Sequence, residues 1–142
     1  CNDFPRLNTL WIDCDTEGSD NLSTAISSLQ NLHALHMWSF SFTEDQVYTI
    51  LKNLTNLEKF ILHNITLSDQ SFLSLARMPQ LHALGINLET GYKNLHLLTN
   101  QNNFPALGCL AIRCFYPHNL LWRDEVQTQL ANYRPTLNVK FW

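Results

Sequence analysis

The chain has 142 residues, which is enough for one ordinary domain with a core of its own. Hydrophobic residues make up 45% of it, a globular share that argues against intrinsic disorder. The formal charge of -3 argues against a nucleic-acid partner, because domains that neutralise phosphates are usually strongly basic. No apolar run approaches the roughly 18 residues of a membrane span, so we expect no membrane partner either.

Six segments align with one another, and the first five share the apolar pattern LxxLxxLxL, with Phe, Met or Ile as occasional substitutes. The second Leu of the pattern falls at Leu7, Leu32, Leu57, Leu81 and Leu107, and Leu137 is the best match in the last segment. The gaps between these residues are 25, 25, 24, 26 and 30 positions. A near-constant period predicts a repeat architecture. We expect strand units near 7–14, 32–39, 57–64, 81–88, 107–114 and 137–142, within one repeat fragment that covers 1–142.

Proline supports the same alignment, because four of the five prolines precede the second Leu by two positions: Pro5, Pro79, Pro105 and Pro135. Proline cannot continue a helix and biases its predecessor towards extended backbone. It therefore marks the passage from helix to strand in four of the units.

The stretches between the strands have helical spacing. The residues that form one apolar face are Leu22, Ile26 and Leu29 in the first stretch, Val47, Ile50, Leu51 and Leu54 in the second, and Val126, Leu130 and Tyr133 in the last. Thr43 and Gln46 form a predicted capping box, and Ser68 is a second predicted N-cap. Each unit is thus expected to be a strand, a turn, a helix and a return.

The pattern resembles the leucine-rich-repeat superfamily over essentially all 142 residues. The shorter extracellular type of repeat carries Asn just after the last strand Leu, whereas this chain has Cys14 in the first unit and Cys114 in the fifth. With its helical second half, the chain looks more like the helix-containing intracellular subfamilies. The resemblance implies an α/β solenoid of about six repeats, with parallel strands on the concave face and helices on the convex face. It also leads us to expect the C-terminal part of a longer protein.

In such a solenoid, alternate strand residues point into the core and their neighbours point outwards. Large aromatic residues on a rigid outward face are favoured anchors for a partner. The residues that we expect to contact a partner on the concave face are Trp11, Asp13, His36, Trp38, Lys59, Ile61, His63, Asn87, Arg113 and Trp142. Asp13 and Arg113, in the first and fifth units, are expected to give this face an acidic end and a basic end.

Six histidines raise the question of a metal or a catalytic site. His33 and His82 precede strands two units apart, about 10 Å by strand spacing, and no Cys or carboxylate joins them in register. Zinc needs three or four converging ligands, so we expect no metal and no cofactor. The motifs GxSxG and HExxH and a phosphate-binding glycine loop are absent from the sequence, which predicts a protein that is not an enzyme.

The predicted function is a non-catalytic protein–protein interaction module. The resemblance favours substrate or ligand recognition within an F-box-type ubiquitin ligase. Two alternatives stay open: the ligand-sensing or autoinhibitory repeats of a nucleotide-binding immune receptor, and an inhibitor-type or structural scaffold.

The cysteines bear on the compartment. Cys14 and Cys114 hold the same repeat position four strand spacings apart, roughly 19 Å, whereas a disulfide needs α-carbons within about 7 Å. Cys109 is expected to point outwards, away from Cys114, and Cys1 lies at the other end of the repeats from Cys109. We therefore predict four free thiols and a reducing compartment, the cytoplasm or the nucleus.

Overall fold

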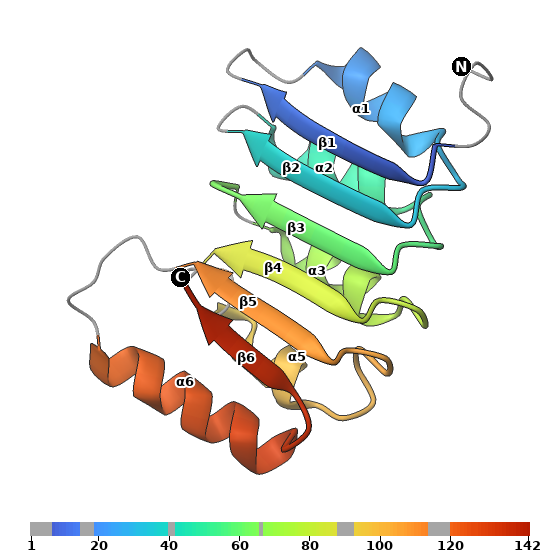
Figure 1. Cartoon of the computed structure of the whole chain (residues 1–142). Coiled ribbons are helices and arrows are strands. Elements are labelled where there is room, and N and C mark those ends of the chain that lie inside the picture. The colour runs from blue at the N-terminus through green and yellow to red at the C-terminus, as the bar shows by residue number, and fades with distance from the viewer. Residues whose placement is uncertain (1–6, 15–18, 40–41, 66, 88–92, 114–119) are drawn as a thin grey trace.

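A computed structural model describes residues 7–14, 19–39, 42–65, 67–87, 93–113 and 120–142 (Figure 1). Six strands alternate with helices along the chain. The elements are β1 (Thr9–Cys14), α1 (Asp20–Ser27), β2 (Ala34–Ser39), α2 (Glu44–Leu51), β3 (Lys59–His63), α3 (Asp69–Ala76), β4 (Ala83–Asn87), α5 (Leu95–Thr99), β5 (Cys109–Arg113), α6 (Leu120–Tyr133) and β6 (Asn138–Phe141). Residues 88 and 114, which end two of the predicted units, lie outside the described residues, and so do residues 1–6, which contain Cys1 and Pro5.

The strands form one open sheet in the order β1-β2-β3-β4-β5-β6, and every neighbouring pair is parallel. As seen in Figure 1, α2, α3 and α5 lie behind the sheet, α1 lies at its β1 edge and α6 runs along its β6 edge. The prediction of an α/β fold with parallel strands that alternate with helices is confirmed. We call the face of the sheet opposite the helices the strand face.

The core lies between the sheet and the helices, and two rows of strand residues fill it. Members of each row are register partners across the sheet or hold equivalent strand positions. The rows are Leu10, Leu35, Phe60, Leu84, Leu110 and Val139, and Ile12, Met37, Leu62, Ile86, Ile112 and Phe141. Those of β2 to β5 are almost wholly buried, whereas those of β1 and β6 are partly buried. The expected alternation of inward and outward residues along the strands is confirmed.

A repeated hydrogen-bond pattern fixes the register of the sheet. The carbonyl of Asn8 accepts from two consecutive amides of the next unit, His33 N at 2.8 Å and Ala34 N at 2.9 Å. The carbonyls of His33, Glu58 and His82 each accept from the corresponding amide pair of the unit that follows. Each unit therefore gives the next strand the same anchoring point.

The last unit departs from this pattern by one residue. Among the described residues, the carbonyl of Gly108 accepts from one strand amide, Asn138 N at 2.9 Å. In the first five units the second Leu precedes its strand by two positions, whereas Leu137 precedes β6 by one. A one-residue deletion thus explains why Leu137 matched the repeat least well.

Helices α2 and α3 begin at the predicted N-caps. Thr43 and Gln46 form the capping box of α2: the hydroxyl of Thr43 accepts from Gln46 N at 3.3 Å, and Gln46 Oε1 accepts from Thr43 N at 3.1 Å. Ser68 caps α3 by accepting from Ser71 N at 3.1 Å. One expectation was wrong: Tyr133, at the end of α6, is 55% exposed rather than part of the apolar face.

The β6 end of the sheet is held by side-chain contacts from the last helix and the turn after it. Arg134 donates to the carbonyls of Phe104 at 2.7 Å, Asn103 at 3.1 Å and Leu98 at 3.4 Å. On α6, the ring of Trp122 meets the ring of Phe141 edge-on, with centroids 6.3 Å apart, and the guanidinium of Arg123 lies 4.8 Å from the same ring. Among the described helices, none is long and apolar enough to cross a membrane.

Candidate functional site

The strand face carries three columns of outward side chains, because the strands are in register and alternate residues share a face. The first column, nearest the strand starts, is Thr9, Ala34, Lys59, Ala83, Cys109 and Asn138. The middle column is Trp11, His36, Ile61, Gly85, Ala111 and Lys140. The last column is Asp13, Trp38, His63, Asn87, Arg113 and, directly after β6, Trp142. All ten predicted contact residues thus occupy outward register positions.

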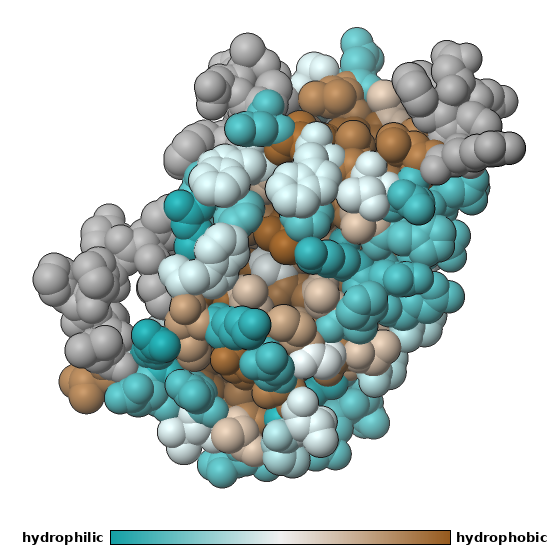
Figure 2. Space-filling view, viewed as in Figure 1, coloured by the Kyte–Doolittle hydropathy of each residue, from teal (hydrophilic) through white to brown (hydrophobic). Residues whose placement is uncertain are grey.

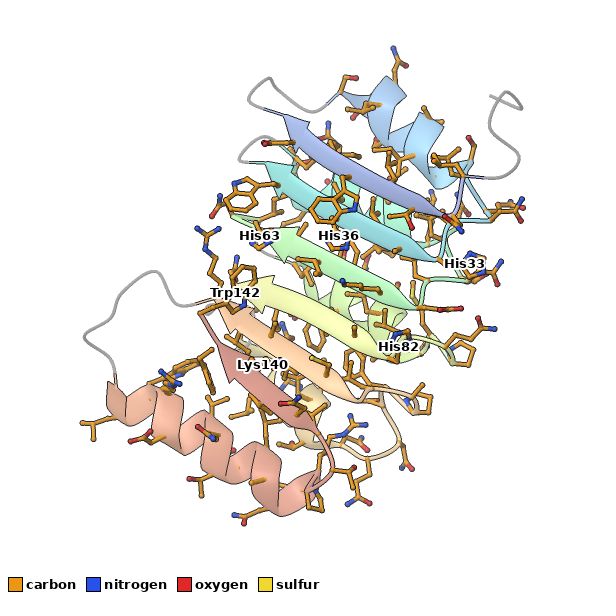
Figure 3. The ribbon with its side chains drawn as sticks, viewed as in Figure 1. His33, His36, His63, His82, Lys140 and Trp142 are labelled. Carbon is orange, nitrogen blue, oxygen red and sulfur yellow. The ribbon has the colours of Figure 1, made fainter. Side chains whose placement is uncertain are left out.

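Aromatic rings stack between neighbouring strands over β1 to β3. Trp11 and His36 lie almost parallel, with centroids 4.1 Å apart and an interplanar angle of 7°. Trp38 and His63 stack at 4.5 Å. Trp142 meets His63 edge-on at 4.7 Å, although three strand positions separate β3 from β6 (Figure 3). We call Trp11, His36, Trp38, His63 and Trp142 the aromatic cluster.

Arg113 adds a cation to the aromatic cluster. Its Cζ lies 4.9 Å from the centroid of the Trp38 ring and 5.9 Å from that of Trp142. These distances suit cation–π attraction. Its Nη1 is also 3.4 Å from Nδ1 of His63, which can accept when the ring is neutral. The guanidinium thus ties Trp142 and His63 to Trp38.

Two histidines of the cluster are held neutral. Burial, followed by the charges of Arg113 and His36, lowers the pKa of His63 below its usual range. Burial, followed by the charge of Lys59, lowers the pKa of His36. Near pH 7 both imidazoles are therefore uncharged stacking partners.

A hollow of about 390 Å³ opens between the rings. It is lined by Trp11, Ile12, Asp13, His36, Met37, Trp38, Ile61, His63 and Trp142. Asp13 supplies the one carboxylate among these residues. In Figure 2 pale aromatic side chains gather on this part of the face. Trp11 is 72% exposed, Trp142 51% and Trp38 44%. An apolar hollow with exposed aromatic walls suits an apolar side chain from a partner.

The structure corrects three expectations about this face. Asn87 lies at its predicted register position, but its side chain is buried and its Nδ2 donates to the carbonyl of Ile65 at 2.7 Å. His63 is equally buried, so its ring supports Trp38 and Trp142 rather than being exposed to a partner. Arg113 does not leave a basic end opposite Asp13, because its guanidinium reaches back over Trp38 on β2.

Sequence reasoning did not predict that these side chains meet. Alternation along a strand places a Cβ on a face, but it does not say that Trp142 and Arg113 extend across several strands. The sequence did hold one signal of this extension. Gly85 and Ala111 in the middle column are small, so they leave space on the strand face beside the aromatic residues.

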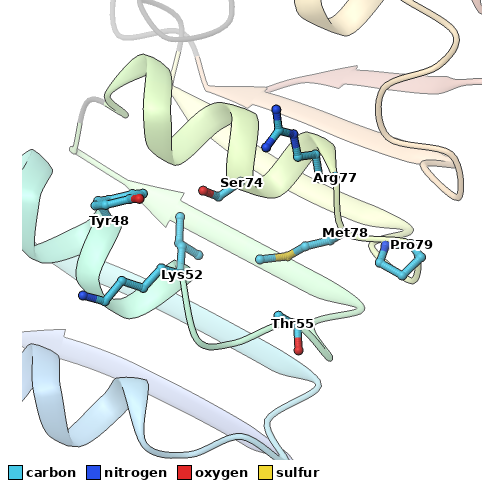
Figure 4. A pocket seen from close by; sticks show the side chains of 8 residues that line it. Tyr48, Lys52, Thr55, Ser74, Arg77, Met78 and Pro79 are labelled. Atoms are coloured by element: carbon cyan, nitrogen blue, oxygen red, sulfur yellow. The ribbon is translucent and has the colours of Figure 1, made fainter.

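A second hollow, of about 320 Å³, lies on the helix side between α2 and α3 (Figure 4). Lys52 and Arg77 line it, but their charged ends extend away from each other. The hydroxyl of Ser74 is used within its own helix, donating to the carbonyl of Gln70 at 2.9 Å. This hollow is a groove between neighbouring helices and offers no convergent set of polar groups.

Metal-binding groups do not converge in the part of the chain that the structure describes: no three of its His, Cys, Asp or Glu side chains form a cluster. His33 and His82 lie apart at the starts of β2 and β4 (Figure 3). No protein-family model matches the chain, and a search of curated proteins gives no significant match.

Proposed function

We propose that this chain is a non-catalytic, protein-binding module of leucine-rich-repeat type that holds its partner on the strand face. The observation that carries the proposal is the aromatic cluster around its hollow of about 390 Å³. Tryptophan contributes strongly to binding where it is presented on a rigid surface and becomes buried by a partner.

The distribution of exposed apolar side chains supports the strand face over the helix side. Among the described residues, three of the large exposed hydrophobic side chains, Trp11, Trp38 and Trp142, line one hollow. The other three in this part of the chain are scattered over α3 and α6: Leu73, Leu121 and Tyr133. Single exposed apolar residues are ordinary, whereas a contiguous group marks an interaction site.

Replacing Trp38 with alanine tests the proposal. Peptides selected from a random library against the wild-type chain serve as probes, and their affinity is measured by fluorescence anisotropy. Trp38→Ala should weaken binding by about 2 kcal/mol or more, because Trp38 is a central wall of the hollow. Gln127→Ala, on the exposed side of α6, is the control and should leave affinity unchanged.

A folding defect would mimic a loss of binding. The unfolding midpoint of each variant is therefore measured in parallel and compared with that of the wild type. If Trp38→Ala binds the selected peptides as tightly as the wild type does, the site lies elsewhere and the proposal fails.

As the biological setting we propose substrate recognition within an F-box-type ubiquitin ligase, in the cytoplasm or the nucleus, which rests on the repeat pattern of the sequence. The sequence of the full-length gene product upstream of Cys1 tests this setting. An F-box there supports it, whereas a GxxxxGK[ST] loop would favour the immune-receptor alternative. The absence of both motifs would favour the inhibitor or structural scaffold.

A further inference from the structure

The strand face has a charge opposite to that of the whole chain. Within the six strands, the charged side chains are those of Lys59, Arg113, Lys140 and Asp13. Three cations and one carboxylate give these strands a net charge of +2, with histidines neutral, whereas the chain as a whole carries -3. The net charge of the whole chain therefore does not reveal that its six strands are basic.

Each of the three cations stands beside a residue that lines the hollow. Lys59 is two residues before Ile61 on β3, and Lys140 on β6 is two residues before Trp142 (Figure 3). The guanidinium of Arg113 lies over Trp38 and Trp142. Asp13, the one charged residue that itself lines the hollow, is on the edge strand β1.

The effect of these cations on the pKa values of the histidines also indicates that the strand face is positively charged. After burial, Lys59 is the next cause of the lowered pKa of His36, and Arg113 is the next cause for His63. Positive potential from both cations therefore extends over the aromatic cluster. The nearest acidic neighbour of Lys59 in sequence, Glu58, precedes β3 and lies at the start of the strand, away from the last column.

Two of the cations are available to a partner. Neither Lys59 nor Lys140 forms an ion pair with any described residue. Lys140 is exposed and Lys59 is partly exposed. A cation without an ion pair, two residues from the lining of an apolar hollow, gains most from a partner that brings both an apolar group and a negative charge.

We infer that the strand face binds an acidic segment of its partner protein, with an apolar side chain in the hollow and carboxylates opposite Lys59, Arg113 and Lys140. This inference rests on the proposed protein-binding function and names the chemistry of its ligand. The acidic part of the segment lies over β3 to β6, because Asp13 repels it at β1. A cationic ligand fits less well, since Arg113 already contacts the rings of Trp38 and Trp142.

The experiment uses peptides selected from a random library on the immobilised whole chain. Selected peptides should be enriched in Asp and Glu beside an apolar residue. The double variant Lys59→Glu/Lys140→Glu should weaken their binding at least about tenfold, because it reverses two of the three cations. Binding should also weaken as salt is raised, since rim charges are screened.

The matched control is Lys52→Glu/Arg77→Glu, which makes the same change of net charge on the helix side. It should leave affinity within about twofold, because these residues lie across the molecule from the hollow. Circular dichroism checks the fold of each variant. Should the change at partly buried Lys59 unfold the chain, Lys140→Glu alone replaces the double variant, with Lys52→Glu as its control.

The outcomes separate the inference from the function on which it rests. Peptides that require Trp38 but are basic or neutral, or that bind the charge-reversed variant equally well, overturn the acidic ligand and leave the binding face standing. Peptides that are indifferent to Trp38→Ala, or a selection that yields no binder, overturn the binding face itself.

Discussion

The two ends of the sheet are built from the same repeat but are stabilised differently. At the β1 end, the core residues Leu7, Leu10 and Ile12 are only partly buried, and Trp11 beside them is largely exposed. At the β6 end, Val139 and Phe141 are partly buried too, but α6 packs Trp122 and Arg123 against Phe141, and Arg134 donates to three carbonyls of the preceding unit. In a repeat structure, each unit is stabilised by its neighbours on both sides. Equal backbone geometry therefore does not imply equal stability.

The largest test of this contrast compares one core position in two units. Leu10 and Leu35 are register partners on β1 and β2. Leu35 is fully buried, so Leu35→Ala should cost about 3 kcal/mol of unfolding free energy through lost contacts and a cavity. Leu10→Ala should cost roughly 1 kcal/mol, because part of that side chain already meets solvent. Urea unfolding measures both; equal losses would mean that β1 is supported as well as β2.

The next test removes the contact that holds the β6 end. Arg134→Met keeps most of the aliphatic stem but leaves the carbonyls of Leu98, Asn103 and Phe104 without the guanidinium. We expect a loss of about 2 kcal/mol, since hydrogen bonds to a charged group are stronger than neutral ones. Arg77→Met, on an exposed arginine after α3, is the control.

Hydrogen exchange locates the effect of Arg134→Met. The amides of β6 should lose protection while those of β1 keep theirs, because the two edges are five strands apart. An equal loss at β1 would show that the sheet opens as one unit.

A smaller effect concerns pH and the interior strands β2 and β3. The folded chain holds His36 and His63 with lowered pKa values, so the unfolded chain takes up their protons first. Stability should therefore fall as pH falls through about 6.5, the ordinary histidine value, and level off below the folded pKa values. His63→Gln should flatten the profile measured by urea unfolding, whereas His33→Gln, at the start of β2, should not. A profile that rises towards acid would contradict the neutral stacked rings.

The smallest expected change concerns the thiols. Cys109 is a free, partly buried thiol on the first column of β5. Cys1, Cys114 and the side chain of Cys14 lie outside the described residues, and the register prediction of four free thiols covers them as well. Alkylation without reduction, followed by mass spectrometry, should label four cysteines. Two intramolecular disulfides would contradict both the register and the reducing compartment.

Strand order, register and core rows could be predicted from the sequence because they depend on a period. A Leu recurring at a near-constant interval, with Pro at a fixed offset, leaves little freedom in how the units align. The contacts of Arg113 and Trp142 across several strands, the burial of Asn87 and the exposure of Tyr133 depend instead on the conformation and surroundings of single side chains. These do not repeat from unit to unit, so the sequence placed each residue on a face but could not show what it contacts.

The paired amides that meet one carbonyl, from the second unit to the fifth, have a consequence for how this protein can change during evolution. They fix the start of a strand without reference to the length of the chain that leads to it, and the gaps between these units range from 24 to 26 residues while the strands stay in register. Insertions and deletions on the helix side are therefore tolerated. Selection can replace the outward residues of each column one at a time, so that new ligands can be acquired while the architecture is inherited unchanged.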